Sequence, residues 1–277
     1  VNILKKNLCN IITSCSEDHL EWLPENDRNI ERIIFEKTSS LLESNIIVSK
    51  QSSKEIVECI KKNISNNKAN KYFFNEDYNF VSMENDFFYY EDKYGSLKIP
   101  KPGMSGQFQL ENASTAIASL RVLENLKIKD EQIVKGIKNA YNSARLEEIK
   151  SGKLKDLVKN NTLIIDSSHN PGGSKALNEY LQTLNCNKHI IVGMMENKDH
   201  EKFINYFKNI SSLTVIDIPN QTNAISGKKL KEKFKKFKNL NYVKNIEQAL
   251  KSLQLEKNDI ILITGSIYLA GEVLNLN

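Results

Sequence analysis

Short apolar runs alternate with helical patterns through the second half of the chain. The runs are rich in β-branched residues, whereas the segments between them repeat apolar residues every three or four positions. The runs are TLIIDSS, KHIIVGM, LTVIDIP and DIILITGS, and the helical patterns include SKALNEYLQTL, HEKFINYFKNI and IEQALKSLQL. Strands that alternate with helices predict an α/β fold with a mostly parallel sheet covered by helices.

The first half has a different pattern. A strand-like run, CNIITSC, precedes a probable helix in NIERIIFEKTSSLL, and residues 72–100 alternate aromatic and polar residues between turn residues, as β-hairpins do. Two further helices are expected over Leu110 to Leu126 and Asp130 to Tyr141. We therefore expect a domain boundary near residues 142–145, with one domain over 1–143 and a second over 144–277.

Composition narrows the class of protein. The 277 residues are 40% hydrophobic and 26% charged, with no apolar run near the roughly 20 residues of a membrane span and no signal-peptide pattern in VNILKKNLCN. We expect a cytoplasmic protein. Its four cysteines lack the close pairs of zinc sites, so they predict no cysteine-built metal site.

The most basic stretch is GKKLKEKFKKFKNL, within a net charge of +5. Leu230, Phe234 and Phe237 recur there at helical spacing, with lysines at most other positions. This pattern favours a surface helix with a buried apolar stripe over a nucleic-acid or membrane surface.

Polar residues fill the turn in LIIDSSHNPGGSKAL, where an apolar run stops at Asp166 and a helix begins about five residues later. Asn170 is a suitable N-cap and Pro171 suits the first helical position, which explains part of the turn by capping alone. The carboxyl end of a strand before a helix is also where open α/β sheets bind anionic ligands. At this level both interpretations stand.

Five segments occur in an order that resembles the folylpolyglutamate synthase/dihydrofolate synthase family of the Mur ligase superfamily. They are SEDHLEWL, SGQFQLENASTAIASLRVL, SARLEEI, DSSHNPGG with VGMMENKD, and LITGSIYLAGEVL, and they extend over most of the chain. The resemblance implies part of a central ATPase domain followed by a Rossmann-like glutamate-ligase domain.

The same resemblance implies a reaction. The family uses ATP and Mg²⁺ to join L-glutamate to dihydropteroate or to folate polyglutamates through an acyl phosphate. Such a site must neutralise polyphosphate charge with cations and oriented N–H groups. We accordingly expect small-molecule substrates, no nucleic-acid or membrane partner, and a monomer.

Four residues acquire nucleotide roles from the resemblance. Asn112 would bind the adenine through its amide, and Arg145 would grip phosphate with its planar fork. Asp166 would bind the ribose hydroxyls, while His169 would face the reacting phosphate. The alternatives are an Asn in an early helical turn, a surface ion pair of Arg145 with a neighbouring glutamate, and a hydrogen-bonded loop histidine.

Three further residues match family positions. His19 corresponds to a Mg²⁺ ligand, a role that rests on the resemblance because Mg²⁺ prefers oxygen. Lys37 corresponds to a carbamylated lysine, although the sequence FEKTSS departs from the family's EKAGI, and a helix-surface lysine is the alternative. Ser266 would help line the substrate cleft, or else serve strand-end packing.

One family motif is missing. No G-x-x-x-x-G-K-[ST] phosphate loop occurs in the 277 residues, and the chain starts at Val1. We expect a piece of a longer ligase that is inactive by itself. Two alternatives remain open, namely a truncated nucleotide-binding relative without turnover and a Mur ligase of cell-wall synthesis.

Overall fold

The computed structural model describes residues 4–17, 23–82 and 86–277. Two compact units divide the chain, residues 1–141 and residues 142–277, and each is considered by itself. No helix in the described ranges is long and apolar enough to cross a membrane. The four cysteines are free thiols, and burial raises the pKa of Cys9 and Cys15.

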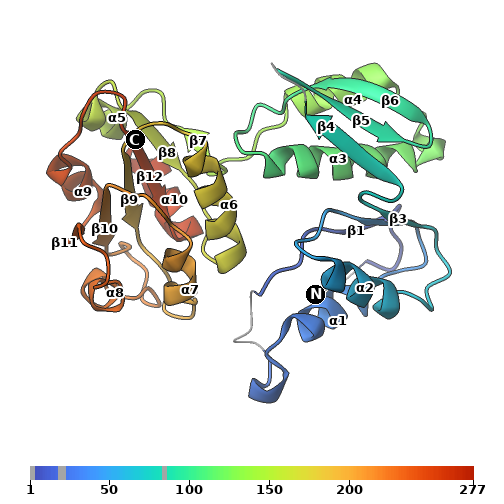
Figure 1. Cartoon of the computed structure of the whole chain (residues 1–277), viewed down its shortest axis with the longest axis horizontal. Coiled ribbons are helices and arrows are strands. Elements are labelled where there is room, and N and C mark those ends of the chain that lie inside the picture. The colour runs from blue at the N-terminus through green and yellow to red at the C-terminus, as the bar shows by residue number, and fades with distance from the viewer. Residues whose placement is uncertain (1–3, 18–22, 83–85) are drawn as a thin grey trace. The chain divides into compact units, whose positions relative to one another are not determined.

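A six-stranded sheet organises the second unit, in the order β11-β10-β9-β12-β8-β7 (Figure 1). All neighbours pair in parallel except β7, which lies antiparallel to β8. The strands are β7 (Glu147–Glu148), β8 (Thr162–Ile165), β9 (Lys188–Val192), β10 (Ser212–Ile216), β11 (Leu240–Val243) and β12 (Ile260–Thr264). The prediction of a mostly parallel sheet is confirmed.

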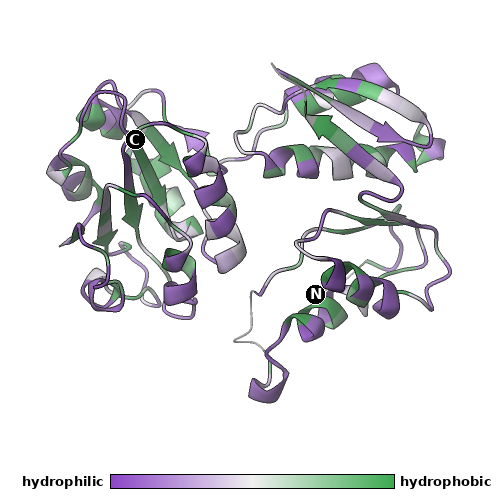
Figure 2. Ribbon diagram, in the orientation of Figure 1, coloured by the Kyte–Doolittle hydropathy of each residue, from purple (hydrophilic) through white to green (hydrophobic). Residues whose placement is uncertain are grey.

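Helices separate these strands along the chain. They are α5 (Lys153–Val158), α6 (Pro171–Gln182), α7 (His200–Asn205), α8 (Gly227–Lys233), α9 (Ile246–Ser252) and α10 (Ile267–Leu276). Figure 2 shows apolar strands inside and polar helix surfaces outside, because strands buried on both faces must be apolar throughout.

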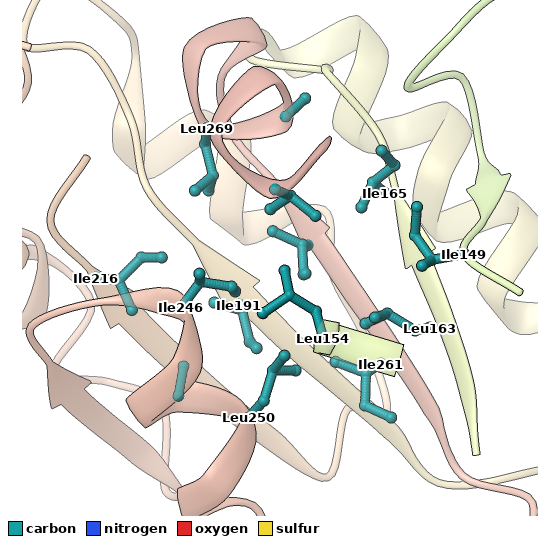
Figure 3. Packing of buried hydrophobic residues seen from close by; sticks show 14 of the residues in the cluster. Ile149, Leu154, Leu163, Ile165, Ile191, Ile216, Ile246, Leu250, Ile261 and Leu269 are labelled. Carbon is teal, nitrogen blue, oxygen red and sulfur yellow. The ribbon is translucent and has the colours of Figure 1, made fainter. Parts of the chain in front are cut away.

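One face of this sheet carries the largest apolar cluster. Leu163 and Ile165 of β8 and Ile261 of β12 pack there with Leu154 of α5 and Leu250 of α9 (Figure 3). Helix α10 adds three more buried side chains, Leu269, Ala270 and Val273. The alternate strand residues point to the opposite face, so burial on both faces fixes the register of the four central strands β8, β9, β10 and β12.

The first unit begins with a small parallel sheet, β1-β2-β3, of which the sequence pattern predicted only the first strand, in CNIITSC. Its strands are β1 (Asn10–Ile12), β2 (Ile46–Val48) and β3 (Lys71–Phe73), and its helices are α1 (Ile30–Thr38) and α2 (Lys54–Asn63). A 3-10 turn covers Glu25–Asp27. Asn29 and Ser53 cap the two helices by accepting backbone N–H groups, which explains where each helix starts.

An antiparallel sheet follows in the same unit, as the alternating pattern predicted. Its strands are β4 (Tyr78–Ser82), β5 (Phe87–Asp92) and β6 (Gly95–Pro100), paired β4-β5-β6. Helices α3 (Phe108–Arg121) and α4 (Asp130–Lys138) complete it, with a 3-10 turn over Glu124–Leu126. The helix expected to reach Leu126 thus ends at Arg121, whose side chain forms ion pairs with Asp92 and Asp130.

Candidate functional site

The turn after β8 is held by a buried carboxylate. Asp166 is 1% exposed, and its Oδ1 accepts the backbone N–H of Ser168 at 2.7 Å. Its Oδ2 accepts the backbone N–H of Leu146 at 2.9 Å. The carboxylate therefore fastens the segment before β7 to the carboxyl end of β8, a structural task that the sequence did not predict.

The segment that Asp166 fastens carries Arg145 between two left-handed residues. Ala144 has φ +54° and Leu146 has φ +48°, a region that costs residues other than glycine about 1–2 kcal/mol each. Ala144 donates its N–H to Glu147 Oε2 at 2.8 Å, and its carbonyl accepts the N–H of Ser167 at 2.9 Å. These bonds stabilise a backbone shape that is unfavourable by itself.

This backbone conformation exposes the guanidinium of Arg145 while its backbone is held in place. Ala144 and Leu146 are buried, whereas Arg145 between them is exposed. Among the described residues, none forms a hydrogen bond or ion pair with the Arg145 side chain, so the expected alternative of an ion pair with Glu147 or Glu148 is not formed. Strained residues held rigidly beside an exposed cation are typical of a ligand site.

His169 and the helix behind it continue the same edge. The Nδ1 atom of His169 lies 3.0 Å from the carbonyl of Ser167, so in the neutral ring Nδ1 carries the hydrogen and Nε2 is the acceptor. Asn170 caps α6 by accepting the N–H of Gly173 at 2.7 Å, and Pro171 occupies the first turn. The predicted cap is confirmed, and Asn170 rather than His169 provides it.

Two glycines bring neighbouring segments against this turn. A Cβ at Gly173 would lie 2.7 Å from the Cβ and Oγ of Ser168. Gly265, at φ +107°, has no room for a side chain because the carbonyl of Gly193 would lie 2.7 Å away. Gly265 instead donates its N–H to the carbonyl of Ser168 at 2.9 Å. The carboxyl ends of β8, β9 and β12 are thus packed into one edge.

Ser266 lies at this edge but faces inward. It is 2% exposed and caps α10, with Oγ accepting the N–H of Tyr268 at 3.1 Å. This arrangement matches the alternative of strand-end packing that the sequence left open. The next two residues, Ile267 and Tyr268, are 63% and 50% exposed and escaped the sequence prediction.

The other expected nucleotide residue lies in the first unit. Asn112 is exposed on the second turn of α3, and its Nδ2 donates to Gln109 Oε1 at 3.1 Å. Glu111 beside it pairs with Lys50 at 2.7 Å. The Asn112 side chain keeps an acceptor and a second N–H on an accessible surface, which is what adenine recognition requires.

Lys37 and His19 are the two residues expected near the metal. Lys37 is exposed in the last turn of α1, where a cation also suits the helix dipole. His19 lies outside the described residues. Within residues 4–17, 23–82 and 86–277 no group of three or more His, Cys, Asp or Glu side chains could hold a metal ion.

The structure therefore groups Arg145, Asp166, His169 and Ser266 at one sheet edge, with Asn112 and Lys37 in the first unit. The sequence missed Ala144, Leu146 and Glu147, which shape the Arg145 segment. Nothing in their residue types indicates the backbone they adopt, because alanine and leucine rarely enter the left-handed region.

Comparisons with known proteins relate this chain to one family model and to several solved structures. Residues 145–267 match the family model described as Mur ligase, glutamate ligase domain. A search of curated proteins gives no match. Among solved structures, E. coli FolC in complex with ADP superposes with a TM-score of 0.80 at 23% identity, over 96% of this chain and 60% of that one.

Two further structures agree. Mycobacterium tuberculosis folylpolyglutamate synthase, complexed with ADP and AMPPCP, has a TM-score of 0.80 at 19% identity, over 97% of this chain and 63% of that one. The bifunctional folylpolyglutamate synthase/dihydrofolate synthase of Yersinia pestis, complexed with AMPPNP and Mn ion, has a TM-score of 0.79 at 21% identity, over 97% and 61%. The chain thus spans about 60% of the length of these proteins. Residues 145–267 thus match the glutamate ligase domain of the Mur ligases, and the chain as a whole has the fold of the corresponding part of the folylpolyglutamate synthases.

Proposed function

We propose that this chain is part of an ATP-dependent ligase that joins L-glutamate to dihydropteroate, to tetrahydrofolate polyglutamates, or to both. The observation that carries the proposal is the Arg145 segment, an exposed guanidinium on a strained backbone that a buried carboxylate holds in place. It lies at the start of the region that matches the glutamate ligase domain. The order of the sequence motifs supports the folate-type substrate.

The described residues suit the nucleotide. When bound, ATP supplies the phosphoryl group that activates the acceptor carboxylate as an acyl phosphate, and Mg²⁺ neutralises polyphosphate charge. Arg145 offers two parallel N–H groups to phosphate oxygens, and Asn112 offers adjacent donor and acceptor atoms to adenine. His19 is the proposed metal ligand. Lys37, as a carbamate, is the proposed carboxylate-like group.

His169 is proposed to act at the reacting phosphate. Its Nδ1 lies 3.0 Å from the Ser167 carbonyl, a contact that fixes the plane of the imidazole ring. A cationic imidazole would add to the charge that Arg145 supplies as the phosphoryl group moves. These two side chains come from neighbouring segments of the same edge.

In this proposal Asp166 has a structural role rather than the ribose-binding role that the family resemblance implies. Both of its oxygens accept backbone N–H groups, and the carboxylate is buried. Its main contribution is then to position Arg145 and the turn that carries His169. Ser266 likewise contributes through the start of α10, and any contact of either residue with ribose or substrate is secondary.

The test uses the whole translated product of the gene that encodes this chain. Glutamate-dependent ADP release is measured with dihydropteroate, with tetrahydrofolate monoglutamate and with a UDP-muramyl peptide. Activity with either pteridine substrate supports the proposal. Activity with the muramyl peptide alone indicates a cell-wall ligase, and nucleotide binding without turnover with any acceptor indicates a non-catalytic relative. The 277-residue chain by itself is expected to release negligible ADP, because its sequence has no phosphate loop.

A further inference from the structure

The first unit contains a cavity of about 410 Å³, and none of the described residues with a proposed nucleotide role lines it. Its walls are the turn after β3, the paired ends of β4 and β5, the turn into β6 and the second half of α3. The volume falls within the range of small-molecule sites. The cavity is therefore a candidate for a second ligand.

The lining of this cavity is acidic, although the protein as a whole is basic. Four lining residues carry carboxylates and one carries an ammonium group, so the lining has a net charge of −3 in a chain of +5. The charged residues are Glu76, Asp77, Glu91, Asp92 and Lys93. An acidic lining attracts a cation rather than the anions that the Arg145 edge suits.

Two of the four carboxylates already have a cationic partner. Asp92 pairs with Arg121 at 2.9 Å, and Glu76 pairs with a lysine of α2 at 2.8 Å. Among the described residues, no cation forms an ion pair with Asp77 or Glu91. These two carboxylates are therefore left to pair with a cationic ligand.

Two tyrosine rings in the lining already hold an ammonium group. Lys93 Nζ lies 5.5 Å from the ring centroid of Tyr72 and 4.9 Å from that of Tyr94, within the range of cation–π attraction. Tyr72 is in β3, whereas Lys93 and Tyr94 are in the turn between β5 and β6, so the ring pair joins two separate segments. Lys93 is exposed, and such contacts are weak in water, so a ligand cation can replace its ammonium group.

An asparagine in the same lining lacks a hydrogen-bond partner. Asn79 Oδ1 is buried, and no donor in the part of the chain that the structure describes bonds to it. Buried acceptors are nearly always paired, because an unpaired one has lost its bond to water without replacing it. The N–H group of an amine ligand is the kind of donor that this oxygen accepts.

The spacing of the carboxylates argues against a single metal ion as the ligand. Over the described ranges, no three His, Cys, Asp or Glu side chains are placed so that they could hold one. A quaternary ammonium ion would use the rings but would leave the separated carboxylates unpaired. A cation with its charge spread over several nitrogen atoms suits both, because the methylene groups between its nitrogens can pack on the tyrosine rings.

We propose that this cavity is a binding site for a linear aliphatic polyamine. One ammonium group of the ligand would replace that of Lys93 between the two tyrosine rings, while others would pair with Asp77 and Glu91. The site is independent of the proposed ligase activity. It would bind the polyamine without ATP, and it lies outside residues 145–267, which match the glutamate ligase domain.

The experiment titrates the purified 277-residue chain with spermidine by isothermal titration calorimetry, without nucleotide or added metal. Lys93→Ala removes the cation that competes for the rings, and its matched control is Lys98→Ala. Lys98 is also exposed and lies 4.6 Å from the ring centroid of Phe87 in the same antiparallel sheet, but it does not line the cavity. Glu91→Gln removes an unpaired carboxylate from the lining, and Glu131→Gln on α4 removes the same charge elsewhere. Circular dichroism and thermal melts establish that the variants fold, and Lys93→Gln gives the same test if the alanine variant does not.

Lys93→Ala should tighten spermidine binding about fivefold and Glu91→Gln should weaken it about fivefold, whereas each control should change the Kd less than about twofold. Equal changes in a variant and its control, or no binding by the unchanged chain, would overturn the proposal. Tighter binding of choline than of spermidine, with the same dependence on Lys93, would overturn it in favour of a quaternary ammonium site. Displacement of spermidine by an equal concentration of Mg²⁺ would overturn it in favour of a metal site.

Discussion

The two ends of the six-stranded sheet each hold a histidine and a buried aspartate, yet they are built differently. At the amino end, His189 Nε2 lies 3.1 Å from Asp259 Oδ2 and its Nδ1 lies 2.7 Å from Ser212 Oγ. Asp259 also accepts the N–H of Glu256, and its own N–H bonds to Asn161. His189 and Asp259 are 6% and 2% exposed, so this end is a closed network.

At the carboxyl end, the buried aspartate fixes a backbone segment that carries an exposed side chain. Asp166 is as buried as Asp259, but the backbone that it fastens carries the exposed Arg145. The hydrogen bonds of the amino end join strands to one another, whereas those of the carboxyl end stabilise a strained backbone segment. The comparison shows that a buried His–Asp pair can be purely structural, whereas the exposed cation on a strained backbone is the feature that supports the proposal for Arg145.

The largest effect is expected at Arg145. Changing Arg145 to Ala in the whole translated product should lower kcat/KM by about two to three orders of magnitude, because two charged hydrogen bonds to phosphate are lost. The free energy of unfolding should change by less than about 0.5 kcal/mol, since the side chain is exposed. Steady-state kinetics and urea titration give the two numbers. Arg145→Lys, which keeps the charge but loses the fork, should recover only part of the loss.

At the amino end, a substitution should lower stability strongly and kcat/KM little. Asp259→Ala should lower the free energy of unfolding by about 3 kcal/mol, because it leaves the buried His189 ring without its partner and also removes the acceptor of the Glu256 N–H. The kcat/KM of the folded protein should stay within about twofold, because this network lies at the far end of the strands from the site. Ser212→Ala is a milder control at the same end. Lost turnover with unchanged stability would show that the closed network takes part in function.

Sequence patterns predicted the carboxyl edge but not how its residues are held. The apolar run before Asp166 and the cap at Asn170 are local features, and both were found as expected. The bond from Asp166 to Leu146 joins residues 20 positions apart, and the left-handed backbone at Ala144 contradicts local preference. Such features arise from tertiary packing, which overrides the local tendency of the chain.

The first unit shows the same limit. Alternating aromatic residues predicted the antiparallel sheet because the period of two is visible over many residues. In the parallel sheet β1-β2-β3 only β1 was predicted, as an apolar run, because strands of three residues are too short to show any period. The family resemblance implied a ribose-binding role for Asp166, and nothing in the sequence indicated that its carboxylate is buried with both oxygens bonded to backbone N–H groups.

Asp166→Asn tests the structural role of the buried carboxylate. The amide would place an NH₂ group against one of two backbone N–H donors, so the free energy of unfolding should fall by about 1–3 kcal/mol. Turnover should fall about tenfold as Arg145 loses its fixed position. His169→Ala, which removes a partly exposed ring, should lower turnover with a stability loss of less than about 1 kcal/mol. Thermal melts of the two variants, run side by side, should therefore differ, and equal melts would restore the simpler view of Asp166 as a ligand.

The smallest effect concerns pH. Burial lowers the pKa of His200 below its usual 6.5, while its Nε2 donates to the carbonyl of Met195 at 2.9 Å. Below about pH 6.5 the unfolded chain binds a proton at His200 that the folded protein refuses, so stability falls as pH decreases. His200→Gln should flatten this slope between pH 6.5 and 5 and leave stability near pH 8 less affected. Parallel curves for the two proteins would contradict the burial argument.

Amide hydrogen exchange with and without an ATP analogue tests the contrast between the two ends most directly. In the whole translated product, the analogue should slow exchange in residues 142–147 and 166–170, where Arg145 and His169 would meet phosphate. Residues 187–189 and 256–260 should exchange at the same rate in both samples, since their network is already closed. Protection confined to the amino end, or spread equally over both ends, would contradict the assignment of the carboxyl edge as the nucleotide site.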